Sequence, residues 1–286
     1  MKTINLLLFS ILALFFFTSC NEDTKPEAEF GQMVVEFDHM VGTESLKLDS
    51  AGSTNYPYIT ANGQPFNLSL FGYYISKIKL EGPNGEVYED EMNVSVNAAE
   101  VKGYYHVLEG EDASQFITLK NIPAGKYNKI TFTVGIEEEG IQEGVAGGVL
   151  DPAEGAWFWN WNAGYIGFAM EGTSPNSPQE EVIGSGWKIY ENSFAIHVGG
   201  WKNITPAQGE VQKFVNNVKT ITLDFGTTVT VSESLEPEPH IIVDVLKVLN
   251  GAQVDFSTTY SLHSPAPGQV FANQLEDAFI LDHVHQ

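Results

Sequence analysis

Histidine is the residue type in this sequence whose spacing most directly allows metal chemistry. His283 and His285 form an H-x-H pair, and alternate residues of an extended segment point to the same side. We therefore expect both imidazoles within reach of one shared metal ion, with ordinary solvated side chains as the alternative. Imidazole suits copper, zinc, iron and nickel. Three further histidines are candidate ligands, namely His39, His197 and His240, whereas His106 and His263 are expected to be surface or hydrogen-bonded residues.

Other metal-binding groups are limited by composition. Cys20 is the only cysteine, so a site built from several thiolates is excluded within one chain. Asp38 and Asp282 each precede a candidate histidine and are expected to accept a hydrogen bond that orients a ligating imidazole. The acidic run Glu137–Glu139 offers oxygen ligands of the kind that calcium takes, although such runs are usually solvated loops.

A tryptophan block is the second unusual feature. Residues 155–162 read GAWFWNWN and hold three of the five tryptophans. On a strand, Trp157, Trp159 and Trp161 would share one face. Two interpretations stay open at this point: the rings close one end of the fold, or they form a redox, stacking or ligand-binding surface.

Several classes of function are disfavoured. The sequence has no nucleophile elbow, phosphate-binding glycine loop, HExxH motif or EF-hand loop, and no carboxylate pair stands out among the 37 acidic residues. We therefore do not expect an enzyme. The net charge is −23 and all positive residues are lysines, with no arginine to read phosphates or guanine, so nucleic acid is not expected as a partner.

The elements that must position these residues are short strands bounded by Gly, Pro, Asn or Asp, which is typical of an all-β sandwich. We predict one domain over residues 33–286, with a loop-like insertion at 174–186 and short helices near 207–218 and 272–280. The predicted strands are 33–37, 71–80, 104–108, 116–119, 129–136, 165–171, 194–198, 220–225, 228–231 and 240–248.

The first residues predict export. A short positive start is followed by an apolar run over residues 6–17, which is too short to span a bilayer and is typical of a secretory signal. Residues 18–20, Thr-Ser-Cys, resemble a lipobox, so we expect a lipoprotein signal peptide over 1–19 and acylation of Cys20, with an ordinary soluble export signal as the alternative. Acidic residues after Cys20 favour the outer face of the outer membrane over its periplasmic face, and residues 20–32 are predicted to form a tether.

Taken in order, these segments resemble the MbnP-like proteins, a family of exported copper-binding proteins. The specific part is residues 148–155 (GVLDPAEG) followed by 158–165 (FWNWNAGY) and then Glu171-Gly172. Weaker matches span the mature chain at 37–42 (FDHMVG), 73–76 (YYIS), 122–127 (IPAGKY), 197–200 (HVGG), 239–241 (PHI) and 282–285 (DHVH). Two departures are the extra residue Trp157 and the presence of Asn160 and Asn162 where some relatives have a nearby histidine.

The resemblance implies a β-sandwich that binds copper through histidine and, in characterised relatives, through a tryptophan oxidised to kynurenine by a di-haem enzyme of the MbnH type, related to cytochrome c peroxidases. On this basis His197 is the first expected ligand, and Trp159 or Trp161 is the residue expected to be modified. The histidines expected next are His39, His283 and His285, with His240 last.

Three kinds of function follow from these observations. The first is a surface protein that captures copper, for which folding must gather imidazoles from remote stretches of the chain into one pocket. The second is a glycan-binding or adhesin-type lipoprotein in which exposed tryptophans stack on sugars. The third is an interaction module in which the tryptophans belong to the core.

Overall fold

The computed structural model describes residues 29–205, 208 and 213–286. The expected signal peptide, Cys20 and most of the expected tether lie outside these residues. Within the described part, strands dominate and the helices are few and short, so the predicted all-β sandwich is confirmed. No helix in this part of the chain is long and apolar enough to cross a bilayer.

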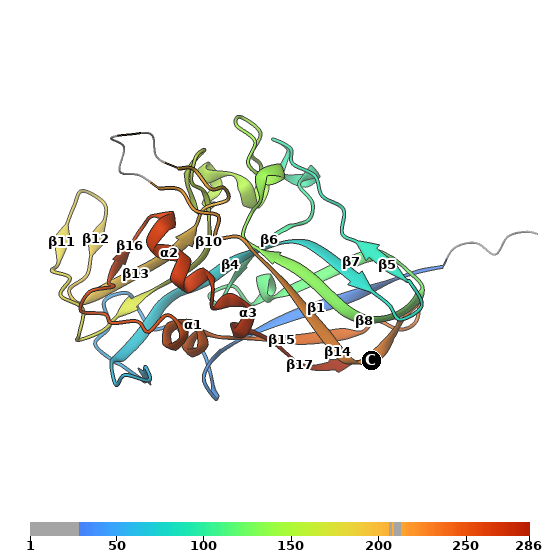
Figure 1. Cartoon of the computed structure of the whole chain (residues 1–286), viewed down its shortest axis with the longest axis horizontal. Helices are drawn as coiled ribbons and strands as arrows, with labels where there is room; N and C mark the ends of the chain where they lie inside the picture. The colour runs from blue at the N-terminus through green and yellow to red at the C-terminus, as the bar shows by residue number, and fades with distance from the viewer. Residues whose placement is uncertain (1–28, 206–207, 209–212) are drawn as a thin grey trace, which may run out of the picture.

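The smaller sheet runs in the order β17-β15-β1-β2, and β7 also pairs with β1 (Figure 1). In this sheet β1 and β15 lie side by side in parallel. The last strand, β17, pairs with β15 antiparallel and forms one edge. Its strands are β1 (Phe30–Val41), β2 (Glu44–Ser45), β7 (Phe116–Pro123), β15 (Glu238–Asp244) and β17 (Phe279–His285).

The larger sheet follows the order β14-β8-β4-β10-β13-β16, with four shorter strands paired to β4 or β10. The main strands are β4 (Pro65–Glu81), β8 (Gly125–Val134), β10 (Gly164–Thr173), β13 (Ser193–Gly199), β14 (Lys219–Val231) and β16 (Ser261–Leu262). The shorter ones are β3 (Tyr58–Ile59), β5 (Val87–Glu89), β6 (Tyr104–Leu108) and β9 (Phe158–Asn160). A separate hairpin is made of β11 (Val182–Ile183) and β12 (Lys188–Ile189), within and just after the predicted insertion.

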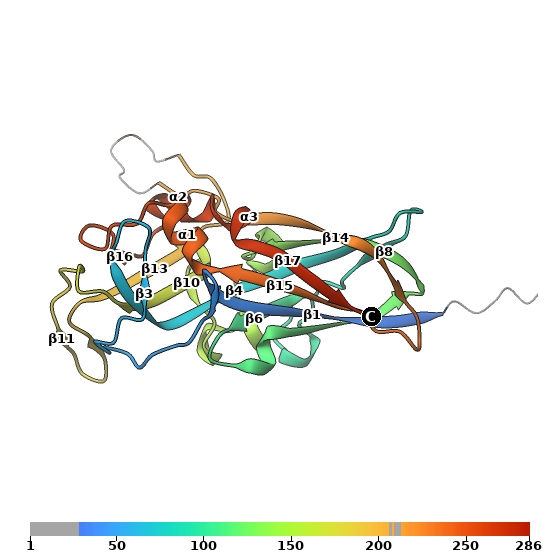
Figure 2. The ribbon, with the colours of Figure 1, turned by 90° about the horizontal axis from the view of Figure 1, so that it is seen from below.

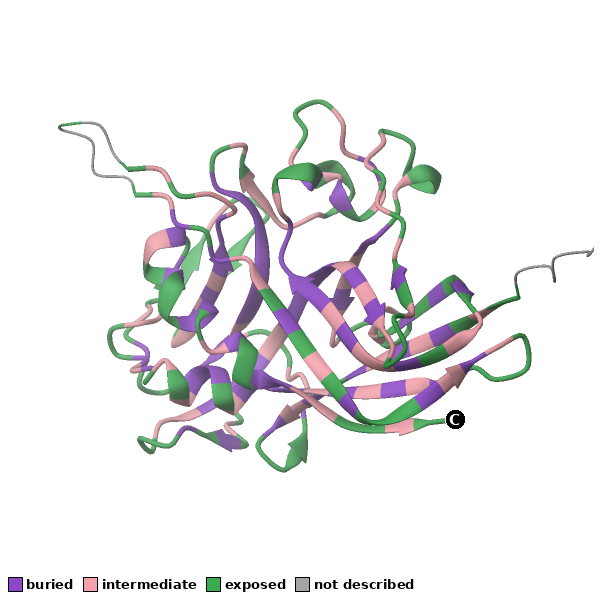
Figure 3. Cartoon of the chain, turned by 45° about the vertical axis from the view of Figure 1, so that its right-hand side comes forward, coloured by how far each residue is buried: buried purple, intermediate pink, exposed green. Residues whose placement is uncertain are grey.

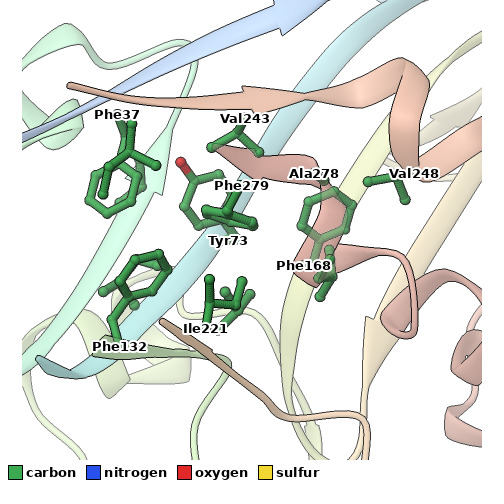
Figure 4. Close-up of a cluster of buried hydrophobic side chains, with 14 of the residues drawn as sticks. Phe37, Tyr73, Phe132, Phe168, Ile221, Val243, Val248, Ala278 and Phe279 are labelled. Carbon is green, nitrogen blue, oxygen red and sulfur yellow. The ribbon is translucent and has the colours of Figure 1, made fainter. Parts of the chain in front are cut away.

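The two sheets pack face to face on an aromatic core. Phe37 of the smaller sheet makes edge contacts with Tyr73 and Phe132 of the larger one, with ring centroids 6.0 and 5.7 Å apart. Phe279 of β17 packs on the same rings (Figure 4). Buried and exposed residues alternate along the long strands, so each sheet also has an outer face (Figure 3).

The outer face of the larger sheet carries a second buried group, here called the outer cluster: Tyr74, Tyr104, Ile136, Leu150 and Tyr165. Two of its tyrosines hold the loop that precedes the tryptophan block. The Tyr74 hydroxyl donates to the carbonyl of Val149 at 3.1 Å, and that of Tyr165 donates to the carbonyl of Leu150 at 2.7 Å. Burial raises the pKa of Tyr165 to about 12, so this hydroxyl remains a donor at neutral pH.

Some predicted element boundaries were wrong. The strand predicted over 240–248 ends at Asp244, whose carboxylate caps helix α1 (Val245–Gly251) by accepting from the Leu246 amide. The strands predicted over 220–225 and 228–231 form one irregular strand, β14. Residues 213–218 of the predicted helix are not helical, and the rest of it lies mostly outside the described residues.

The predicted C-terminal helix is in fact two helices and a strand. Helix α2 (Pro265–Ala272) begins with proline, whose fixed backbone angle suits the first turn. It is followed by α3 (Leu275–Ala278) and then by β17. The described residues also contain five 3₁₀ turns: η1 (Ala98–Glu100), η2 (Asp112–Gln115), η3 (Glu138–Gly140), η4 (Gly148–Leu150) and η5 (Pro152–Glu154).

Candidate metal centres

Small residues neighbour His197 on the outer face of the larger sheet. Gly72 of β4, Ala169 of β10 and His197 of β13 are aligned in register across three neighbouring strands. Ile196 and Val198 belong to the core, so the alternation of β13 turns His197 outward. An imidazole therefore lies beside two positions with little or no side chain.

His263 completes a pair with His197. β16 pairs in parallel with β13, and its residue Leu262 is aligned with Ile196, so the residues that follow them lie side by side. The Nδ1 atoms of His197 and His263 are 3.0 Å apart, and the rings meet edge to face at 4.6 Å. Sequence reasoning set His263 aside, because nothing local in the sequence shows which strand β16 joins.

A carboxylate holds the other side of His197. Its Nε2 donates to Oε1 of Glu171 at 2.7 Å, which fixes the ring and leaves Nδ1 as the atom directed at His263. Carboxylate partners of this kind orient metal-ligating imidazoles in proteins. Burial lowers the pKa of His263, and the charge of His197 lowers it further while Glu171 acts in the opposite direction. The pair can therefore offer two nitrogen lone pairs to one cation.

The side chains beside this pair enclose a groove. A cavity of about 380 Å³ is lined by Glu171, Ala195, Tyr190, Tyr260 and His263, among others. Its far wall includes residues of the β12 hairpin strand. His263 and Glu171, the two partners of His197, thus lie at the side of a space large enough for a hydrated ion or a small metal complex to approach.

The tryptophan block does not form one flat strand face. Only Trp159 lies within β9, and a turn follows that strand, so the expected common face for Trp157, Trp159 and Trp161 was wrong. The ring of Trp159 covers Gly199, since a Cβ at that glycine would lie 2.9 Å from Cζ3 of the indole. Gly199 is two residues beyond His197 and on the same face. Trp159 therefore extends over the strand that carries His197.

The other two tryptophans have different neighbours. The backbone amide of Trp157 donates to the Tyr74 hydroxyl at 3.1 Å, and its ring covers Gly72. Trp161 packs on Phe158, with ring centroids 4.7 Å apart. All three are partly buried, so the block is a wall above the sheet and neither a core plug nor a free stacking surface.

His106 is a further residue of this face that sequence reasoning missed. It stacks on Tyr74 at 4.2 Å and meets the edge of Trp157 at 4.4 Å. Its Nε2 is buried and has no hydrogen-bond partner among the described residues. Burial lowers the pKa of His106 to about 4, so the ring is neutral at physiological pH.

A second group of histidines occupies the outer face of the smaller sheet. Within the described residues, two groups of three potential ligands lie within 4.8 Å of one another, and both include His240. One is His240 with His283 and His285, and the other is His240 with Glu36 and Glu238. The predicted single pocket is therefore wrong: these histidines lie on the opposite sheet from His197.

His39 stands apart from both groups. It is 4% exposed and faces the core, where its Nδ1 donates to Glu109 at 2.7 Å and its Nε2 faces the Tyr73 hydroxyl at 2.9 Å. Its ring also packs against Phe71 and Tyr73. Because both nitrogens are engaged inside the fold, His39 fits a structural role and not the expected role of a ligand.

The acidic run expected to suit calcium is partly paired with a lysine. Nζ of Lys77 lies 2.5 Å from a carboxylate oxygen of Glu137 and 3.0 Å from one of Glu139. These ion pairs raise the pKa of Lys77 against the opposing effect of burial. Two of the three carboxylates thus share one cationic partner, and calcium at this run stays a prediction.

Comparison with known proteins adds three findings. The model of the MbnP family matches residues 30–264. The solved structure of MbnP from Methylosinus trichosporium is similar at 16% sequence identity, covering 84% of this chain and 83% of that chain with a TM-score of 0.46. No curated protein sequence matches this chain. The family match includes His197 and His263 and ends before His283 and His285.

Proposed function

This chain belongs to the MbnP family, and on that premise we propose that it is an exported, lipid-anchored protein that binds copper and passes it on without catalysing a reaction. Copper is the cargo in this proposal. It would be taken on the outer face of the larger sheet, by His197 and His263.

The facing nitrogens of these two histidines carry the proposal. Their Nδ1 atoms are 3.0 Å apart, and Glu171 occupies the remaining nitrogen of His197. Imidazole suits copper, and a site without thiolates must rely on it. Two imidazoles leave coordination positions open, which suits a protein that must release its ion as well as bind it.

Trp159 is the tryptophan best placed to supply a third ligand after oxidation. Intact indole does not ligate a metal readily, whereas opening the ring to kynurenine yields an aryl amine and a carbonyl that can. The ring of Trp159 lies over Gly199 on the face that carries His197, whereas Trp161 is packed on Phe158. A di-haem enzyme of the MbnH type is the proposed partner for this oxidation.

The proposed anchor is an acyl group on Cys20, which would hold the protein at the outer membrane, on the cell surface. Intact-mass measurement of protein from its native host reports acylation, tryptophan oxidation and metal content together. An unacylated Cys20 would contradict the anchor, and an unchanged Trp159 would contradict the third ligand, without affecting the histidine pair.

The histidine pair is tested by copper titration of the isolated mature protein. We expect the His197→Ala, His263→Ala double variant to bind copper at this site at least about 100-fold more weakly, because both nitrogen donors are lost. His285→Ala is the comparison variant, since it removes an exposed imidazole from the other sheet and so reports any copper that is bound there. Identical copper affinity and stoichiometry in the wild type and the double variant would refute the proposed function.

A further inference from the structure

We propose that the smaller sheet carries a second metal site, in which His240, His283 and His285 bind one borderline divalent cation such as Zn²⁺ and tie the last strand, β17, to β15. This site is separate from the copper site and does not depend on it.

Strand register brings the ligands together. His240 on β15 is aligned with Glu36 on β1 and with His283 on β17, so the three residues form a row across neighbouring strands. His285 is aligned with Glu238, which lies two residues before His240 on β15. Ile241 and Val243 of β15 point into the core, so His240 points outward.

The distances suit one ion. The Nε2 atoms of His283 and His285 are 3.1 Å apart, and the ring of His240 lies 4.3 and 4.8 Å from theirs, centroid to centroid. Zinc–nitrogen bonds of 2.0–2.1 Å in a tetrahedron require ligand nitrogens about 3.3 Å apart. The rings therefore need only small rotations to share a cation.

A carboxylate already orients one of these imidazoles, and a second carboxylate lies close to another. Nδ1 of His283 donates to Oδ2 of Asp282 at 2.7 Å, which directs its Nε2 at His285. Oε2 of Glu36 lies 2.8 Å from Nε2 of His240, but the two atoms are not aligned for a hydrogen bond. That buried Nε2 has no hydrogen-bond partner among the described residues, and a cation would satisfy both it and the Glu36 carboxylate.

Burial in the apolar core does not account for this grouping. His283 and His285 are exposed on the solvent side of the sheet, so neither contributes to the core. Three imidazoles in mutual contact would repel one another if protonated, whereas a bound cation would attract all three lone pairs. β17 is the edge strand of its sheet, so a cation shared by these rings would fix an edge that otherwise pairs on one side only.

The position of the site separates it from the copper site. His197 and His263 belong to the larger sheet, whereas these ligands belong to the smaller one. In Figures 1 and 2, β13 and β16 lie toward one end of the long axis and the C-terminus, next to His285, lies toward the other. Variants of one group therefore leave the other group in place.

Zinc titration of three mature proteins tests the proposal: the wild type, the His283→Ala, His285→Ala variant and the His197→Ala, His263→Ala variant as the matched control. Zn²⁺ alone is the probe, with bound metal counted by elemental analysis. We expect the control variant to bind one zinc ion as the wild type does. The affinity for this ion is expected to fall at least about 100-fold in the His283→Ala, His285→Ala variant.

Hydrogen exchange supplies an independent readout. Zn²⁺ is expected to slow amide exchange across Phe279–His285 in the wild type and in the control variant, but not in the His283→Ala, His285→Ala variant. Because both substituted residues are exposed, the variant is expected to fold, which its circular dichroism spectrum checks. The proposal is overturned if the wild type does not bind zinc, or if zinc affinity and exchange are the same in the two double variants.

Discussion

The two histidine groups lie on the outer faces of opposite sheets and differ in how they are enclosed. His197 is half-buried beside Trp159 and is held by Glu171, whereas its partner His263 is exposed at the side of a groove. His283 and His285 are both exposed on an edge strand. A pair with one half-buried member beside an indole can select its ligand by shape and by added donors, whereas an open row selects by nitrogen count and geometry alone.

The two groups also differ in which contacts hold their side chains in place. Beside His197, side chains from distant loops contact the sheet, so the site depends on close approach of an indole to a glycine. Around His283, orientation comes mainly from carboxylates on the same or adjacent strands. The two groups should therefore be separable by substitution, and the following predictions test that difference.

The largest expected effect comes from adding a side chain at Gly199, which the ring of Trp159 covers. A Cβ at Gly199 would lie 2.5 Å from the carbonyl oxygen of Tyr165 and 2.9 Å from the indole, so Gly199→Val must displace the backbone or the ring. We expect the free energy of unfolding to fall by about 3 kcal/mol, with weaker copper binding and unchanged zinc binding on the smaller sheet. Urea unfolding and metal titration measure these effects.

The matched control is Gly110→Ala, where a Cβ would meet only Leu48, at 3.8 Å. Its stability should stay within about 0.5 kcal/mol of the wild type. Equal stability of the two glycine variants would show that the tryptophan wall is not closely packed on the sheet.

The next largest effect is a pH dependence of the free energy of unfolding that arises from His106 on the larger sheet. Burial lowers the pKa of His106 to about 4 from an ordinary value of 6.5. Between these two pH values the unfolded chain binds a proton that the folded protein does not, so the free energy of unfolding falls as pH falls from 6.5 to 4. We expect this residue to contribute on the order of 2 kcal/mol to that loss, since its ring is only partly shielded.

Urea unfolding at pH 7.5 and pH 4.5 measures this contribution in the wild type and in His106→Phe. The variant keeps an aromatic ring on Tyr74 but cannot be protonated, so its stability should change less between the two pH values. Equal pH dependence in the wild type and His106→Phe would rule out the proposed cost of charging His106.

The smallest expected effect comes from the carboxylates that orient each group. Glu171→Gln replaces the carboxylate acceptor on His197 by a neutral amide, and Asp282→Asn does the same on His283. Each substitution is expected to weaken binding of the metal at its own site about tenfold, or by about 1.4 kcal/mol. Binding of the other metal should be unaffected. Parallel copper and zinc titrations check this, and a loss of both metals in either variant would mean that the two groups are coupled.

Much of the fold was predictable from short-range pattern. Period-two alternation predicted strands such as that at 104–108, which β6 matches, and turn residues indicated their ends. The same alternation placed His283 and His285 on one side of their segment. The helix after Asp244 was missed because its apolar residues continue those of the preceding strand, and only the capping contact ends the strand there.

What the sequence determined by itself is therefore local: the strand pattern, the tryptophan block, the family resemblance and the side to which neighbouring histidines point. Tertiary structure alone decided which remote segments meet. The pairing of His197 with His263 depends on the parallel register of β13 and β16, and the row that contains His240 depends on the order of strands in the smaller sheet. Sheet order and register are set by packing over the whole core, and for that reason the histidines expected in one pocket form two groups and a buried His39.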